Sequence, residues 1–293
     1  MIELNKIYCE DCLVTMSRMP DNFIDCCVTS PPYYGLRDYG YPDQIGLEET
    51  SGKYVEKLVK VFAEVKRVLK LEGTLWLNLG DTYSSWKDCK SVPDTLRVGG
   101  KSEPANIIEK GKSHSRNTKM LKSQGLKNKD LIGIPWMVAF ALRVNGWYLR
   151  QDIIWHKPNP MPESVKDRCT KSHEYIFLMS KSANYYYDQE SIYEKAIGND
   201  PYIRNKHSVW AVTTKPFSKA HFATFPEDLI IPCIKAGCPE GGIVYDPFMG
   251  AGTTALVSHK LNCNWIGSEI SPEYCKIAEK RIKPYLMQKN IKF

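Results

Sequence analysis

The chain has 293 residues, of which 43% are apolar and 11% aromatic, and its formal net charge is +7. This composition excludes a disordered or fibrous protein and can supply one large α/β core, alone or with a lobe. The amino terminus lacks the basic and then apolar pattern of a secretory signal, and the longest apolar run, Ile134 to Leu142, is too short to span a bilayer. The sequence therefore predicts a cytosolic protein with no membrane contact.

The first clear element is a short apolar run at residues 24–29, which predicts a buried strand. A turn of Ser30-Pro31-Pro32-Tyr33 follows, and its prolines fix φ and lack an N–H, so the turn should be stiff. It should project from the carboxyl edge of the sheet, where open α/β folds bind ligands. Ser30 Oγ and the Pro31 carbonyl could there accept hydrogen bonds from one amino group while Tyr33 stacks on its planar ring. The alternative is a turn that only closes the strand.

The next elements alternate between helix and strand. An apolar stripe over residues 53–70 predicts a helix, and Gly73 is expected to turn the chain into a strand at 74–79. A helix over 135–144, a strand at 147–155 and another strand at 174–179 follow. This rhythm predicts a mostly parallel sheet with helices on both faces.

A basic segment interrupts this pattern at residues 84–130. It contains eleven Lys and Arg against five Asp and Glu, a difference of 11 − 5 = +6, so nearly all of the net charge lies here. Because the segment has almost no apolar periodicity, it is expected to be a long mobile loop. It could embrace the phosphate backbone of DNA, or be a solvated insertion without a partner.

A glycine-rich turn stands near the carboxyl terminus. An apolar strand ends at Asp246, and Gly250 and Gly252 then lead into a helical stretch from Ala255 to Lys260. Glycines let a ligand approach the backbone, and the start of a helix offers unpaired N–H groups. The next strand, at 265–269, ends in Glu269, 23 positions after Asp246. A carboxylate at this distance commonly binds the ribose of a nucleotide-like cofactor.

Two of these motifs resemble one family. Asp246-Pro247-Phe248 with Gly-Ala-Gly resembles the S-adenosylmethionine loop of DNA amino-methyltransferases, and Ser30-Pro31-Pro32-Tyr33 resembles their catalytic tetrad. The tetrad precedes the cofactor loop, as in the family's beta group, and the resemblance runs from about residue 7 to 283 except for the basic insert. It implies an α/β, Rossmann-like methyltransferase fold with permuted motif order. The alternative is an unrelated Rossmann-like domain with a chance Pro-Pro turn.

The resemblance also implies the binding residues for S-adenosyl-L-methionine. Residues 10–12 resemble the segment that approaches the adenine, although Asp11 could instead be a simple turn carboxylate, and residues 221–227 resemble the motif that closes over the methionine end. The implied cofactor residues are Asp11, Cys12, Phe225, Pro226, Asp246, Pro247, Phe248, Gly250, Gly252, Thr253, Thr254 and Glu269.

For the substrate, the resemblance places a tryptophan, lysine and proline loop beside the flipped base and a target-recognition region at 181–220. The implied DNA-binding residues are Trp155, Lys157, Asn159, Pro160, Arg204, Asn205 and Lys206. Read without the resemblance, the first four belong to a loop between hairpin strands and the last three to a solvated polar face. Lys157 could also contact a phosphate, and His156 is expected to be a hydrogen-bonded loop residue.

Ten cysteines raise the question of a metal site. Cys9 and Cys12 have a zinc-like spacing, but no second pair with histidines follows, and Cys26 and Cys27 lie in the predicted buried strand. The cysteines are expected to be reduced thiols in the core, and no metal is predicted.

These inferences divide the chain into five segments. Residues 1–83 form the catalytic half of the core, 84–130 the basic insert, 131–180 the core continuation with the proline-rich loop, 181–220 the target-recognition region and 221–293 the cofactor-binding half.

The resemblance implies methyl transfer from S-adenosylmethionine to the exocyclic N4 amine of a flipped cytosine in double-stranded DNA. Ser30 favours cytosine-N4 because the family's adenine-N6 enzymes typically carry Asp at that position. Adenine-N6 methylation is the main alternative, followed by RNA or protein glutamine methylation and by a nonenzymatic DNA-binding module. A bacterial or phage-encoded protein associated with the nucleoid through DNA is expected, and a cognate restriction endonuclease and a homodimer are left open.

Overall fold

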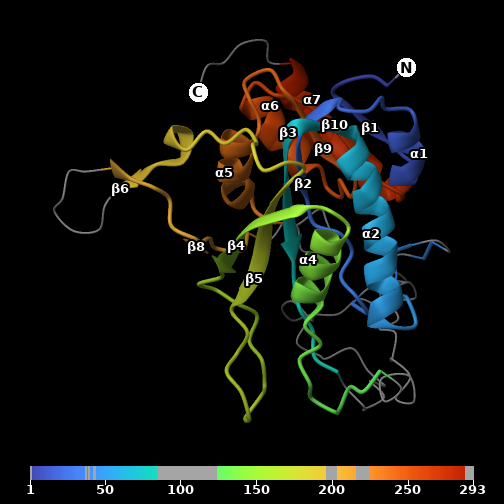
Figure 1. Ribbon diagram of the computed structural model, residues 1–293, viewed down its shortest axis with the longest axis vertical. Helices are drawn as coiled ribbons and strands as arrows, with labels where there is room; N and C mark the ends of the chain where they lie inside the picture. Colours follow the sequence, from blue (N-terminus) through green and yellow to red (C-terminus); the bar gives the residue numbers. More distant parts are fainter. Residues whose placement is uncertain are drawn as a thin grey trace, which may run out of the picture.

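A computed structural model describes residues 2–36, 38, 40–41, 44–84, 124–195, 203–215 and 225–287. These residues fold around one eight-stranded sheet that carries helices on both faces (Figure 1). Most of the basic segment predicted to be a mobile loop, residues 85–123, lies outside the described residues, as do residues 221–224 of the predicted methionine-end motif.

The main sheet has the order β1-β10-β9-β2-β3-β5-β4-β8. Its strands are β1 (Lys6–Tyr8), β2 (Ile24–Thr29), β3 (Leu69–Leu79), β4 (Tyr148–His156), β5 (His173–Ser180), β8 (Val209–Ala211), β9 (Ile243–Asp246) and β10 (Asn264–Ser268). The five strands from β1 to β3 in this order pair in parallel, β5 runs antiparallel to both β3 and β4, and β8 pairs in parallel with β4. A separate ribbon joins β6 (Glu194–Lys195) to β7 (Ile203–Arg204). The expected mostly parallel sheet is therefore confirmed.

The helices pack on the sheet through apolar stripes. They are α1 (Cys12–Ser17), α2 (Ser51–Val68), α4 (Ile134–Val144), α5 (Glu227–Gly237), α6 (Thr253–Lys260) and α7 (Pro272–Met287), with a 3-10 turn η3 (Glu190–Ile192). In α2, the predicted stripe buries Leu58, Phe62 and Val65 completely, and Thr50 caps the first turn by accepting from the backbone N–H of Lys53. The sequence thus specifies both the inward face of this helix and its start.

Alternation along β2 separates the two faces of the core. Cys27 packs into the cluster made with α1, α2 and α4, whereas Cys26 and Val28 pack into the cluster made with α5. Figure 1 shows α2 and α4 on one side of the strands and α5 on the other. Both faces of β2 are therefore buried, which explains why its sequence is a continuous apolar run and confirms the expected packing of Cys26 and Cys27.

Several local details differ from the sequence predictions, including the end of the helix predicted at 53–70, which is α2 and stops at Val68. Gly73 was expected to turn the chain into a strand at 74, but β3 begins at Leu69 and Gly73 lies inside it, beside a register shift against β2. A Cβ at Gly73 would lie 2.5 Å from Leu69 Cγ and 2.9 Å from the Asp25 carbonyl, so close packing is what requires this glycine. The sequence analysis also did not predict β1 and α1, which are short.

No helix in the described part of the chain is long and apolar enough to cross a membrane.

Candidate active site at the carboxyl edge of the sheet

The two motifs singled out in the sequence meet at one edge of the sheet. Because β2 and β9 are parallel neighbours, the residues that follow each strand emerge side by side. Thr29, the last residue of β2, donates its hydroxyl hydrogen to Asp246 Oδ1 at 2.6 Å. This bond joins the proline turn at 30–33 to the glycine loop at 246–252, although the two residues are 217 positions apart.

The Asp246 side chain anchors the glycine loop through hydrogen bonds. It is buried and accepts three hydrogen bonds, from Thr29, from Thr254 Oγ1 at 2.6 Å and from the backbone N–H of Phe248 at 2.9 Å. Burial raises the pKa of Asp246 to about 6, and the three donors act in the opposite direction. The carboxylate therefore holds together the strand end, the loop and the first turn of α6.

The loop leaves its backbone open to a ligand at Gly250, whereas Gly252 packs against α7, where a Cβ would lie 2.9 Å from Ala278 Cβ. Gly250 and Gly252 have φ of 53° and 78°, the left-handed region that favours glycine. A Cβ at Gly250 would meet a single atom within 4 Å, the Phe248 carbonyl oxygen at 3.9 Å, so the space before the loop is open. Gly250 N–H donates to Glu269 Oε2 at 2.8 Å, and Ser271 N–H donates to Oε1 at 2.9 Å. The open backbone and the adjacent carboxylate suit a hydroxyl-bearing cofactor.

The other residues predicted to bind cofactor approach the same edge. The Glu269 N–H donates to the Tyr8 carbonyl at 3.0 Å, which sets the end of β10 beside the chain entering α1. Asp11 caps α1 by accepting from the Leu13 N–H at 2.7 Å, while Cys12 is buried and burial raises the pKa of its thiol to about 12. Further along the chain, Phe225 and Pro226 directly precede α5, and Thr253 and Thr254 are buried at the start of α6; Pro247 is buried and Phe248 is half-buried.

The predicted tetrad is held from several directions. Tyr54 of α2 donates its hydroxyl hydrogen to the Pro32 carbonyl at 2.8 Å. The Tyr33 ring lies so close to Gly80 that a Cβ there would stand 2.5 Å from Tyr33 Cε2. Burial raises the pKa of the Tyr33 phenol well above its usual range, and the nearby charge of Glu174 adds to this. Ser30 Oγ donates to the Tyr33 oxygen over a long 3.5 Å contact.

Two residues missed by the sequence reasoning complete this network. Tyr33 donates to Glu174 Oε2 at 2.7 Å, and its oxygen also lies 3.2 Å from Asn78 Oδ1. Asn78 Nδ2 donates to Glu174 Oε2 at 3.3 Å and to the Tyr175 carbonyl at 3.1 Å. The only sequence signal was a polar residue within each of two apolar strands, β3 and β5. Their pairing brings these side chains to the tetrad.

The proline-rich loop is tied to its neighbours. Lys157 forms an ion pair with Glu174, and its Nζ lies 4.3 Å from the centroid of the Trp155 ring. Trp155 is 4% exposed and donates its indole N–H to the Val212 carbonyl at 2.8 Å. Asn159 exchanges two hydrogen bonds with the backbone of Thr214, at 3.1 and 2.9 Å, and Pro160 is half-buried. The structure therefore brings Lys157 to the tetrad network, while Trp155 and Asn159 bind the segment after β8.

The three residues predicted to read DNA have partners within their own segment. Arg204 Nη2 lies 3.0 Å from Glu194 Oε1, and Lys206 Nζ lies 3.6 Å from Glu194 Oε2. Asn205 accepts a hydrogen bond from Gln189 Nε2. These contacts stabilise the β6–β7 ribbon, and none of them is to a tetrad residue.

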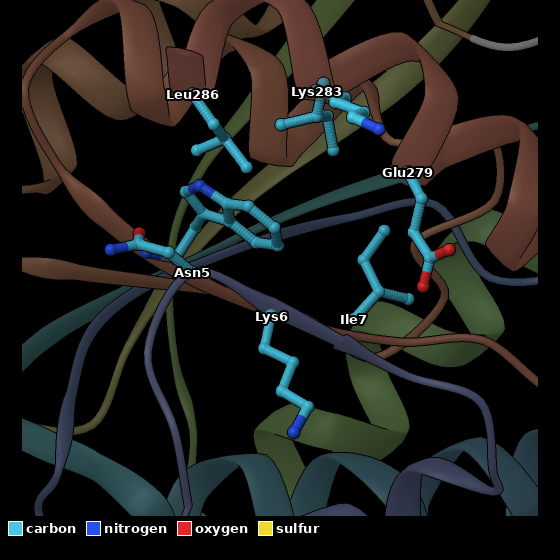
Figure 2. Close-up of a pocket in the computed structure, with 8 residues that line it drawn as sticks. Asn5, Lys6, Ile7, Glu279, Lys283 and Leu286 are labelled. Atoms are coloured by element: carbon cyan, nitrogen blue, oxygen red, sulfur yellow. The ribbon is translucent and has the colours of Figure 1, made fainter. Parts of the chain in front are cut away.

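A pocket of about 240 Å³ lies away from this edge. Figure 2 shows Glu279, Lys283 and Leu286 of α7 beside β1, with the Ile7 side chain directed toward α7 and the Lys6 side chain directed away from it. The pocket also includes Asn5 and Trp265, near the amino ends of β1 and β10. Since the tetrad and the glycine loop follow the carboxyl ends of their strands, this pocket is separate from the candidate site.

Comparison with known proteins agrees with the geometry of the sheet edge. Residues 24–280 match the family model of N6/N4-type DNA methylases, and this span includes both motifs. The chain belongs to this DNA methylase family. Members transfer methyl groups from S-adenosyl-L-methionine, so the enzyme depends on that cofactor, and the open glycine loop and Glu269 fit it.

Several similar sequences carry the name Type II methyltransferase. The chain is 49% identical to Type II methyltransferase M.XycI of Xanthomonas campestris pv. cyanopsidis, over 93% of this chain and 86% of that protein. It is 47% identical to Type II methyltransferase M.Cfr9I of Citrobacter freundii, over 96% of this chain and 89% of that protein. The chain is therefore a DNA methyltransferase that is similar over most of its length to Type II methyltransferases.

Solved structures show the same fold. The cytosine-N4-specific PvuII DNA methyltransferase aligns with a TM-score of 0.67 at 20% identity, over 97% of this chain and 86% of that chain. The protein TTHA0409 of Thermus thermophilus, solved in complex with S-adenosyl-L-methionine, aligns with a TM-score of 0.63 at 19% identity, over 97% of this chain and 95% of that chain. The expected methyltransferase fold is thus confirmed.

Proposed function

We propose that this methyltransferase acts on the exocyclic N4 amine of cytosine in double-stranded DNA. The observation that carries the proposal is Ser30, an uncharged hydroxyl at the first tetrad position, adjacent to Thr29 and its bond to Asp246. The cytosine-N4 enzymes of the family resemble this chain in carrying Ser there, whereas adenine-N6 enzymes typically carry Asp.

An exocyclic amine is a poor nucleophile because its lone pair is delocalised into the ring. Ser30 Oγ and the Pro31 carbonyl accept its two hydrogens and hold the nitrogen near tetrahedral geometry, and the Tyr33 ring stacks on the base. When bound, S-adenosylmethionine supplies the sulfonium methyl as electrophile. Alignment of the amine with the methyl–sulfur bond provides much of the rate. The methylated nitrogen then loses one proton to solvent, which leaves the neutral N-methyl amine.

The residues around the glycine loop form the cofactor site in this proposal. Glu269 accepts from the ribose hydroxyls, and the backbone at Gly250 and Gly252 lies against the cofactor. Asp246 holds the loop in shape through its three donors rather than facing the solvent. Asp11 and Cys12 approach the adenine, and Phe225 and Pro226 approach the methionine end.

DNA binding is assigned to the loops beyond the same edge. The target base leaves the duplex at a cost of a few kcal/mol, which stacking and hydrogen bonds in the pocket offset. Trp155, Lys157, Asn159 and Pro160 shape the loop beside the flipped base. Because Arg204, Asn205 and Lys206 have internal partners here, we propose that they support the recognition segment and turn to DNA only in the complex.

Cytosine C5 methylation is a poor alternative. Cys233 follows Pro232, but it lies inside α5, is 1% exposed, and burial raises its pKa well above the usual range of a thiol. A thiol in this setting is not available as a nucleophile. A cognate restriction endonuclease fits the names of the relatives, and a homodimer is a further proposal that the tetrad chemistry does not require.

The decisive experiment is expression in a methylation-free bacterial host, followed by mass spectrometry of digested DNA. We expect N4-methylcytosine; N6-methyladenine would move the activity to the other amine and contradict the role given to Ser30 in selecting the base. The Ser30→Ala variant should lose about 100-fold or more in turnover while keeping its affinity for S-adenosylmethionine. Undiminished turnover would remove Ser30 from the mechanism.

A further inference from the structure

A directed chain of hydrogen bonds connects Ser30 to β5. Ser30 Oγ donates to the Tyr33 oxygen at 3.5 Å, and Tyr33 donates to Glu174 Oε2 at 2.7 Å. Asn78 Nδ2 donates to the same carboxylate oxygen at 3.3 Å, and Lys157 forms an ion pair with the other oxygen. The Glu174 and Lys157 side chains are 16% and 19% exposed, so this pair lies mostly out of solvent.

The Glu174 carboxylate sets the donor-to-acceptor direction of the hydrogen bonds from Ser30 through Tyr33 to Glu174. An ionised carboxylate only accepts hydrogen bonds, and a tyrosine hydroxyl has one hydrogen. Tyr33 therefore gives its hydrogen to Glu174 over the shorter contact and presents an oxygen lone pair to Ser30. Ser30 can then place its own hydrogen on Tyr33, which leaves the lone pairs of Ser30 Oγ available to another donor.

We infer that Glu174 is a positioning residue for methyl transfer: acting through Tyr33, it holds Ser30 as a hydrogen-bond acceptor for the target amine. This inference rests on the proposed function, in which Ser30 accepts a hydrogen of the amine. Lys157 supports the arrangement by compensating the charge of Glu174. If the direction were reversed, the Tyr33 hydrogen would occupy one of the two lone pairs of Ser30 Oγ, and the Ser30 hydrogen would be free to point at the target amine.

Glu174→Gln tests the direction without changing the size of the side chain. The Gln amide has one acceptor and one donor end. Facing Lys157 with its donor end would be repulsive, so the amide oxygen should turn to Lys157 and the NH₂ group to Tyr33. Tyr33 then accepts from residue 174, and its hydrogen is released toward Ser30 or Asn78.

We expect Glu174→Gln to lower kcat by about 10- to 100-fold, the effect of a misaligned reacting group, with unchanged affinity for S-adenosylmethionine. Glu174→Asp, which remains an obligate acceptor, should keep more turnover than Glu174→Gln. Glu163→Gln is a matched control, because Glu163 lies in the connection that leads to β5, the strand of Glu174, and pairs with Arg168 rather than with the tetrad. It should leave kcat unchanged.

A double-mutant cycle with Tyr33→Phe separates this role from a merely structural one. Without the hydroxyl, Glu174 has no route to Ser30, so Glu174→Gln should cause no further loss of kcat in the Tyr33→Phe background. Additive losses, or undiminished kcat in Glu174→Gln, would overturn the inference. Wild-type enzyme is the reference: if it fails to methylate DNA, the proposed function fails, whereas active wild type beside a fully active Glu174→Gln contradicts the inference alone.

Discussion

Replacing Asp246 with Asn should stabilise the fold at neutral pH, although this carboxylate sits at the centre of the cofactor loop. Burial raises the pKa of Asp246 from an ordinary 3.8 to about 6. A group with a raised pKa favours folding in its protonated form. The contribution of Asp246 to the free energy of unfolding is therefore fully present below about pH 4 and is lost as the pH rises through about 6.

The size of the effect follows from these two pKa values. At pH 7.5, ionisation of Asp246 costs the folded state about 3 kcal/mol, at 1.36 kcal/mol per pKa unit. At pH 4.5 the folded state is almost fully protonated while the unfolded state is mostly ionised, and the cost falls to about 1 kcal/mol. An Asn has the shape of the protonated acid, and its Oδ1 can still accept from Thr29 and Phe248.

The new amide donor also has an acceptor in place. Thr254 Oγ1 lies 3.4 Å from the Val28 carbonyl, so in the Asp246→Asn variant the threonine can turn its hydrogen there and accept from the substituted amide. No buried polar atom of the substituted side chain is then left without a partner.

Urea unfolding without cofactor, at pH 7.5 and at pH 4.5, measures the effect. The variant should exceed wild type by about 3 kcal/mol at the higher pH and by about 1 kcal/mol at the lower. Asp152→Asn is the control, because Asp152 is exposed on β4 and its replacement should change neither value. A variant less stable than wild type at pH 7.5, or a difference independent of pH, would refute the reasoning about burial.

Two further predictions concern the tetrad and the insert. Gly80→Ala should displace the Tyr33 ring, because the new Cβ would lie 2.5 Å from Tyr33 Cε2. We expect kcat to fall about 10- to 100-fold with unchanged cofactor affinity. An unchanged kcat in steady-state assays would show that the position of the ring is not critical. The second variant changes four basic residues of the insert to Gln: Lys110, Lys112, Arg116 and Lys119. It should bind DNA more weakly, and the slope of the logarithm of the binding constant against log salt should become shallower by about 0.9 for each phosphate that is no longer neutralised. A slope equal to that of wild type in a salt titration would mean that these residues touch no phosphate.

The sequence was most informative where chemistry and local geometry coincide. The strand at 24–29 and the stiff turn after it could be predicted because an apolar run and two prolines restrict the backbone directly. The meeting of this turn with Asp246 followed from one rule, that parallel strands bring their carboxyl ends to the same edge. The structure added the bond between Thr29 and Asp246.

The sequence did not predict the contacts that depend on pairing between distant strands. Glu174 and Asn78 reach Tyr33 because β5 pairs antiparallel with β3, in a register that sets Leu79 opposite Tyr175. No local pattern specifies that register. The prediction of a turn at Gly73 was wrong, because a Cβ there would be too close to Leu69 of the same strand and to the Asp25 carbonyl of the neighbouring strand.

The order of the strands explains how a split set of motifs can make one site. Moving across the sheet, β10 and β9 bring Glu269 and Asp246, β2 brings the tetrad, and the adjacent β3 and β5 bring Asn78 and Glu174. Each strand adds the groups at one end, and spatial order rather than chain order sets their neighbours. The cofactor half can therefore follow the catalytic half in the sequence without altering the contact between Thr29 and Asp246, which depends only on β2 and β9 being adjacent.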